Sequence, residues 1–204
     1  MSHAVTAHPG VDAENVERSP LGVSWQKLMM WIFIVSDGLL FAGLLAGYAF
    51  VRIASPFWPD RAEVFHLSLI GFMTFLLISS SATMASAVAA AGRGDRGATV
   101  RFLIFTILGG LGFLGMQAYE WSSLIAEGAR LSSNPWGVPA FGAVFFTITG
   151  FHGSHVLSGV VILAITAWRM AAGKSTAAGI ELAGLYWHFV DLVWVFIFTL
   201  FYLI

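Results

Sequence analysis

Apolar residues fall into five long runs that are separated by short polar segments. The runs cover approximately residues 29–51, 64–91, 102–121, 139–168 and 180–204. An α-helix needs about 20 predominantly apolar residues to cross the roughly 30 Å hydrocarbon core of a bilayer. The pattern therefore predicts an all-α integral membrane protein with five transmembrane helices.

The polar segments between these runs are short and rich in glycine, proline and charge. They are Ser55–Arg61, Gly92–Gly97, Glu127–Val138 and Ala172–Ser175. Short connections make consecutive helices antiparallel neighbours, so we expect one up-down bundle over residues 29–204. The sequence shows no internal repeat, which disfavours a transporter built from two inverted halves.

Composition supports a chain surrounded by lipid. Hydrophobic residues make up 58% of the 204 residues and charged residues 10%, with a mean hydropathy of +0.82. Soluble domains carry about 25% charged residues. A net charge of −1 gives no reason to expect nucleic acid as a partner. The absence of cysteine excludes iron–sulfur clusters and thiolate metal sites.

The first 28 residues are mostly polar and lack the apolar run of a secretory signal. We interpret residues 1–28 as a flexible N-terminal tail. His3 and His8 offer a metal site as the alternative to a simple tail.

Lysine and arginine near the span ends predict the orientation. One side carries Arg18, Lys27, Arg93, Arg96, Arg101, Arg169 and Lys174, and the other carries Arg52, Arg61 and Arg130. Basic residues are enriched on the cytoplasmic side of membrane proteins. We therefore expect a cytoplasmic N-terminus and, after five spans, a C-terminus outside.

A small set of polar side chains falls inside the predicted spans. They are Asp37, Gln117, Glu120, His152, His155, His188 and Asp191. A charge at the bilayer centre costs about 2.5–3.5 kcal/mol on insertion scales, so each needs a partner. His152 and His155 share one helix face, as do His188 and Asp191. Asp37 and His188 both lie about 12 Å deep from the same side, so Asp37, His188 and Asp191 can share a layer.

These buried polar residues admit structural, proton-related, lipid-binding and metal-binding interpretations. Copper or haem would need roughly three or four converging ligands, and His152 with His155 supplies only part of such a set. Polar side chains within membrane bundles commonly pair with one another. We therefore expect no catalytic, cofactor or metal site, and a buried Asp37 bonded to a histidine of the fourth or fifth span.

Small residues are frequent where helices meet. Gly43 and Gly47 form a Gly-x-x-x-Gly pair, and Gly109, Gly110, Gly112 and Gly115 line the third span. Such residues let helix backbones approach closely. We expect them to pack within the bundle, with docking of a partner subunit as the alternative.

Four segments resemble ordered motifs of haem-copper oxidase subunit III. They are Ser36–Gly43 in the first span, Gly115–Trp121 in the third, Phe151–Gly159 in the fourth and Tyr186–Trp194 in the fifth. Phe151–Gly159 resembles the His-Gly-x-His-Val signature of that family, and Tyr186–Trp194 resembles its Trp-His-Phe-x-Asp-x-Val-Trp signature. The likeness extends from about Trp31 to Tyr202, which is nearly all of the predicted bundle.

The resemblance implies an accessory subunit of a proton-pumping terminal oxidase of aerobic respiration in the bacterial inner membrane. Such a chain carries no redox centre, and haem and copper are expected in partner subunits. Subunit I is the implied main partner, with subunits II and IV in the same complex. Members are implied to support subunit I stability and proton uptake, and to bind phospholipid.

Two departures leave alternatives open. Many cytochrome c oxidase members have seven helices and a glutamate in the first motif, whereas this chain has five predicted helices and Asp37. These features are similar to quinol oxidase subunit III, although the Tyr186–Asp191 segment favours the cytochrome c branch. A nitric oxide reductase accessory protein and a small proton-coupled transporter are further alternatives.

Overall fold

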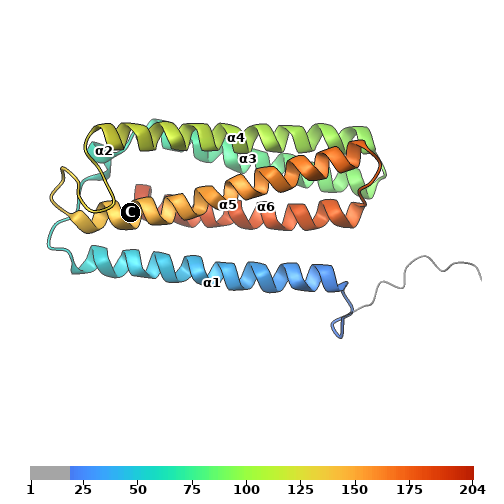
Figure 1. The fold of residues 1–204 in the computed structure, drawn as a ribbon, viewed down its shortest axis with the longest axis horizontal. Coiled ribbons are helices and arrows are strands. Elements are labelled where there is room, and N and C mark those ends of the chain that lie inside the picture. The colour runs from blue at the N-terminus through green and yellow to red at the C-terminus, as the bar shows by residue number, and fades with distance from the viewer. Residues whose placement is uncertain (1–18) are drawn as a thin grey trace, which may run out of the picture.

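The computed structural model describes residues 19–204, and these residues form an all-helical membrane protein (Figure 1). The elements are α1 (Trp25–Ala54), α2 (Arg61–Val64), α3 (Leu67–Gly92), α4 (Arg96–Ala126), α5 (Pro139–Ala171), α6 (Ala177–Phe198) and the π-helical turn η1 (Thr199–Leu203). Within this part of the chain, five helices are long and apolar enough to cross a membrane, which confirms the predicted fold class.

Several helices extend beyond the apolar runs that predicted them. The first begins at Trp25 rather than near residue 29, because the Ser24 side chain accepts a hydrogen bond from the Lys27 amide. Likewise α4 begins at Arg96 rather than near residue 102, because Asp95 caps the Ala98 amide. Capping satisfies amides that lack a partner inside the helix, so a helix extends past its lipid-buried stretch. The expected tail residues 1–18, including His3 and His8, lie outside the described part.

Helices α3 to α6 form the densely packed part of the molecule. The α3–α4 pair has the most extensive contact, followed by α4–α5, α3–α6 and α5–α6. Close approach depends on glycine: a Cβ atom on Gly109 would lie 2.6 Å from the Cβ of Ser80, and one on Gly110 would lie 2.5 Å from the Trp187 ring. Both glycines therefore pack between helices as expected. The expectation is wrong for Gly115, which is exposed and where a Cβ atom would meet nothing within 4 Å.

Helix α1 lies apart from the other spans, along one side of the bundle (Figure 1). Its main neighbours are α6 and α5. Only Asp37, Phe41 and Tyr48 of this helix are buried. Gly43 and Gly47 are exposed, and a Cβ atom on either would meet nothing within 4 Å. The expectation that this glycine pair packs within the bundle is therefore wrong, because it lies on the outward face of α1.

Candidate functional site

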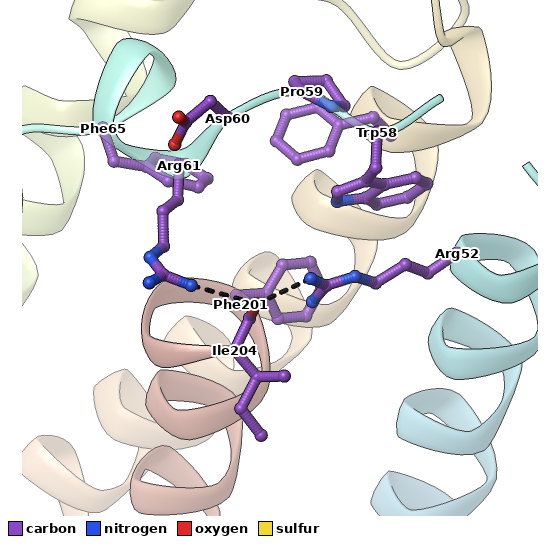
Figure 2. A pocket seen from close by; sticks show the side chains of 9 residues that line it. Arg52, Trp58, Pro59, Asp60, Arg61, Phe65, Phe201 and Ile204 are labelled. Atoms are coloured by element: carbon purple, nitrogen blue, oxygen red, sulfur yellow. Dashed lines mark hydrogen bonds between the residues drawn. The ribbon is translucent and has the colours of Figure 1, made fainter. Parts of the chain in front are cut away.

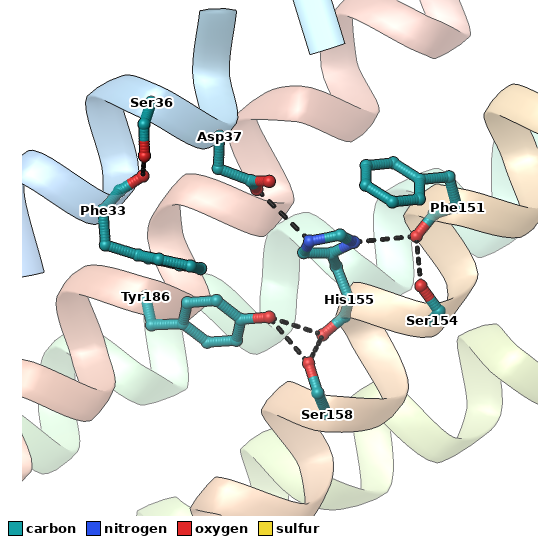
Figure 3. A network of polar contacts seen from close by, with 8 residues as sticks. All are labelled: Phe33, Ser36, Asp37, Phe151, Ser154, His155, Ser158 and Tyr186. Carbon is teal, nitrogen blue, oxygen red and sulfur yellow. Dashed lines mark hydrogen bonds and ion pairs between the residues drawn. The ribbon is translucent and has the colours of Figure 1, made fainter. Parts of the chain in front are cut away.

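Asp37 and His155 form an acid–histidine pair that joins α1 to α5 about halfway along both helices. Asp37 Oδ2 lies 3.3 Å from His155 Nε2, and the two side chains are 9% and 15% exposed (Figure 3). Phe41 covers the imidazole with an edge contact at 5.3 Å between ring centroids. An ionisable pair at this depth is shielded from water on most sides.

The second ring nitrogen of His155 is held within its own helix. Nδ1 lies 2.8 Å from the carbonyl oxygen of Phe151, one turn earlier in α5 (Figure 3). A carbonyl oxygen only accepts, so Nδ1 carries a proton and donates it. Nε2 is left facing Asp37 Oδ2 over 3.3 Å, and Oδ2 has no hydrogen bond among residues 19–204. The two ionisable groups are thus in close contact without a hydrogen bond between them.

Hydroxyl groups extend this pair towards α6. Ser158 donates to the His155 carbonyl oxygen over 2.9 Å, and Tyr186 of α6 donates to the same oxygen over 3.2 Å. The Ser158 and Tyr186 hydroxyls lie 2.7 Å apart (Figure 3). Three helices therefore meet at His155 through polar contacts.

His152 does not join His155 in a ligand set. Its ring is fully buried and packs at 5.7 Å from the Phe113 ring and 5.1 Å from the Trp194 ring, measured between centroids. Neither ring nitrogen has a hydrogen-bond partner among the described residues. Within residues 19–204, no group of three or more His, Cys, Asp or Glu side chains is arranged to hold a metal.

His188 and Asp191 do not form a cluster with Asp37. His188 Nδ1 lies 2.6 Å from the Ser81 hydroxyl of α3. Asp191 is buried, and its Oδ1 has no partner in the described part of the chain. Next to Asp37, the α6 residue that approaches the first helix is Phe189, which lies 3.6 Å from the Cβ position of Gly38. Successive helical residues point about 100° apart, so a shared depth did not bring His188 to Asp37.

Gln117 and Glu120 join α4 to its neighbours. Gln117 Nε2 donates to the Thr149 carbonyl oxygen of α5 over 2.8 Å. Glu120 is 2% exposed, and its carboxylate lies 3.2 Å from His66 Nδ1 and accepts from the His66 amide over 3.3 Å. Sequence reasoning missed this pairing of His66, although both residues lie at the same end of adjacent predicted spans.

A second polar cluster lies at the C-terminal end of α1. Arg52 and Arg61 approach the Ile204 carbonyl oxygen from opposite sides, over 2.6 and 3.0 Å (Figure 2). Arg52 also donates to the Tyr48 hydroxyl, which donates to the Leu200 carbonyl oxygen. Arg52, Arg61 and Ile204 line a cavity of about 310 Å³ together with aromatic residues that include Phe65 and Phe141. The cluster ties α1 and the α1–α2 connection to the end of η1.

Residues 20–204 match the family model described as cytochrome c oxidase subunit III. The chain belongs to this family. The match includes Asp37, His155 and all five membrane-spanning helices, so the resemblance carried by the four motifs is confirmed.

Individual relatives include both branches of the subunit III family. The chain is 32% identical to cytochrome c oxidase subunit 3 of Alkalihalophilus pseudofirmus, across 100% of this chain and 98% of that protein. It is 36% identical to cytochrome c oxidase subunit 3 of Bacillus subtilis, across 94% of each. It is also 38% identical to quinol oxidase subunit 3 of Bacillus subtilis, across 86% and 85%. The chain is therefore a multi-pass membrane subunit of a multi-subunit oxidase complex.

Proposed function

We propose that this chain is the accessory subunit III of a proton-pumping cytochrome c oxidase in a bacterial inner membrane. It acts beside subunit I, together with subunits II and IV of the same complex. The haem and copper are held by partner subunits. Its own part is to support subunit I and its proton uptake, and to hold phospholipid. The observation that carries this proposal is the Asp37–His155 pair within a family match covering nearly the whole chain.

The proton-related role rests on the protonation chemistry of this pair. Because His155 Nδ1 donates to the Phe151 carbonyl oxygen, Nε2 is the ring nitrogen that faces the Asp37 carboxyl group, at 3.3 Å. A neutral pair avoids most of the cost of placing charge in the hydrocarbon region, whereas an ion pair is favoured when a neighbouring charge stabilises it. The pair therefore responds to charge on a subunit that faces it. Such a group can hold a proton near the uptake path of the catalytic subunit.

Orientation forms part of the same proposal. The basic residues at the start of α1 and at the α3–α4 and α5–α6 connections lie at one end of the bundle. The positive-inside rule assigns that end to the cytoplasm and the end of η1 to the outside.

Asp37 substitutions in the purified oxidase test the proposal. Asp37→Asn removes the ionisable carboxyl group while it retains the size of the side chain, and Asp37→Leu removes all polar atoms as well. We expect the initial rate of oxygen consumption to stay near that of the unaltered enzyme, while the number of turnovers before inactivation falls severalfold. Ser36→Ala is the matched control, because the exposed Ser36 hydroxyl bonds only within its own helix. An unchanged number of turnovers before inactivation in both Asp37 variants would contradict the proton-related role.

A quinol oxidase subunit is the second candidate, because one relative named as a quinol oxidase subunit matches at 38% identity. The complex that contains this chain decides between the two. Oxidation of reduced cytochrome c supports the first candidate, and oxidation of quinol without cytochrome c supports the second.

A further inference from the structure

A polar cluster of α3 and α6 lies at the surface of the chain rather than in its core. The Ser81 hydroxyl of α3 lies 2.6 Å from His188 Nδ1 of α6, and both residues are half-buried. His188 is about 17 Å along α6 from Ala177, which places it near the middle of a roughly 30 Å hydrocarbon core. Ionisable residues at this depth almost always face protein or a water-filled space instead of lipid.

The cluster has hydrogen-bonding groups that the chain leaves unused. A neutral imidazole has one donor and one acceptor nitrogen, and His188 Nε2 takes part in none of the hydrogen bonds among residues 19–204. Asp191, one turn later on the same side of α6, is 9% exposed, and its Oδ1 has no partner in that part of the chain either. An unpaired polar group is costly in hydrocarbon, so the cluster calls for a further polar group at this depth.

His188 lies on a strip of α6 that faces outward between α3 and α1. Ser81 marks the α3 side of this strip, and Phe189, which lies 3.6 Å from the Cβ position of Gly38, marks the α1 side. Within residues 19–204, α1 and α3 make no extensive contact with each other, so the strip is open between them. This His188 strip includes Leu192, one turn after His188, which is 56% exposed.

Small and apolar side chains border the cluster on α3. Ile78 precedes Ser81 by three residues and Ala85 follows it by four, so all three share one face of the helix. Both Ile78 and Ala85 are exposed. Small residues let the backbone of a second helix approach closely, and polar side chains then bond across the interface. A polar centre with a small, apolar border is therefore suited to a helix and not to acyl chains, which offer no hydrogen-bonding group.

We propose that the His188 strip binds a transmembrane helix of another subunit of the same complex, and that this helix has a polar side chain at mid-membrane depth. Serine, threonine, asparagine and glutamine are the side chains that commonly form such contacts between helices. The partner side chain bonds to His188 Nε2, while Nδ1 keeps its contact with Ser81. The inference rests on the proposed role as an accessory subunit, and it applies whether the complex oxidises cytochrome c or quinol.

Site-specific crosslinking in the purified complex tests the proposal. The chain has no cysteine, so Leu192→Cys gives it a single attachment point for benzophenone maleimide on the His188 strip. We expect illumination to join this chain to another subunit, and His188→Leu to lower the yield by roughly fivefold. Leu157→Cys is the matched control, because Leu157 of α5 is 53% exposed and any crosslink from it should not depend on His188.

A second variant separates the partner's contact from the contact within this chain. Ser81→Ala removes the bond to His188 Nδ1 but leaves Nε2 free for the partner, so the yield should fall by less than about twofold. Crosslinks to lipid alone, an unchanged yield in His188→Leu, or an equal loss in Ser81→Ala would each overturn the inference. An active oxidase with no His188-dependent crosslink contradicts only this helix contact, whereas a chain that purifies without oxidase subunits contradicts the proposed function.

Discussion

Helices α1 and α4 both cross the membrane and both contain glycine runs, yet they are attached to the bundle by different means. Gly109 and Gly110 of α4 admit Ser80 and Trp187 at close range, whereas a Cβ atom on Gly43 or Gly47 of α1 would meet nothing within 4 Å. In contrast, α1 is attached by polar contacts near its start, middle and end. These join Lys27 to Glu181, Asp37 to His155, and Tyr48 with Arg52 to the end of η1.

The contrast shows two ways to associate helices where lipid removes the hydrophobic driving force. Packed small residues gain many weak contacts over a long surface. Polar contacts gain strength from their dry surroundings but fix only a few points along the helix. Lys27 and Tyr48 are separated by about 31 Å of helix, so the polar contacts of α1 span the bilayer thickness.

The largest expected effect comes from breaking the central contact of α1. His155→Leu leaves Asp37 buried without its partner, which should destabilise the chain by about 3 kcal/mol. Denaturation by sodium dodecyl sulfate, followed by circular dichroism, measures this loss. The double variant Asp37→Leu with His155→Leu should recover part of it, because no unpaired ionisable group then remains. Equal losses in the single and double variants would show that the pair does not attach α1.

Packing at α4 is tested by adding one methyl group. Gly110→Ala places a Cβ atom 2.5 Å from Trp187 and 2.8 Å from Val160, so the helices must separate. Overpacking of this kind costs about 1–3 kcal/mol. The same denaturation measurement applies, and tryptophan fluorescence should report the displaced Trp187 ring. A variant as stable as the unaltered chain would contradict the close approach of α4 to α6.

The polar contact at the C-terminal end of α1 should contribute less. Tyr48→Phe removes the hydroxyl that donates to the Leu200 carbonyl oxygen over 2.9 Å and accepts from Arg52. A hydrogen bond of this type contributes about 1 kcal/mol. Arg52 keeps its contact with Ile204, so the end of α1 should stay in place. Hydrogen exchange at the last turn of α1 measures the local loosening, and no change there would rule out this role of the hydroxyl.

The smallest effect is expected at the outward glycines of α1. Gly47→Ala adds a methyl group in open space and replaces a poor helix former, so stability should stay within about 0.5 kcal/mol or rise slightly. Gly110→Ala serves as the contrasting variant. A loss above 1 kcal/mol in Gly47→Ala within the isolated chain would mean that this face packs against the bundle after all.

Hydropathy predicted the five spans, because lipid requires long apolar helices whatever their neighbours are. The four motifs predicted the family, and the match over residues 20–204 confirms it. The starts of α1 at Trp25 and of α4 at Arg96 were not predicted from hydropathy, since capping by Ser24 and Asp95 extends these helices into polar surroundings. The sequence also did not identify which histidine lies beside Asp37, because the fourth and fifth spans contain three histidines.

The sequence was sufficient to predict that the chain crosses a membrane, how many times it does so, and which polar residues lie within the spans. Each of these depends on composition and length along one helix. Which face of a helix meets which neighbour depends on rotation about its axis, and depth in the membrane does not report it. Only the folded arrangement therefore decided that Asp37 lies beside His155, that Glu120 lies beside His66, and that the glycines of α1 face outward.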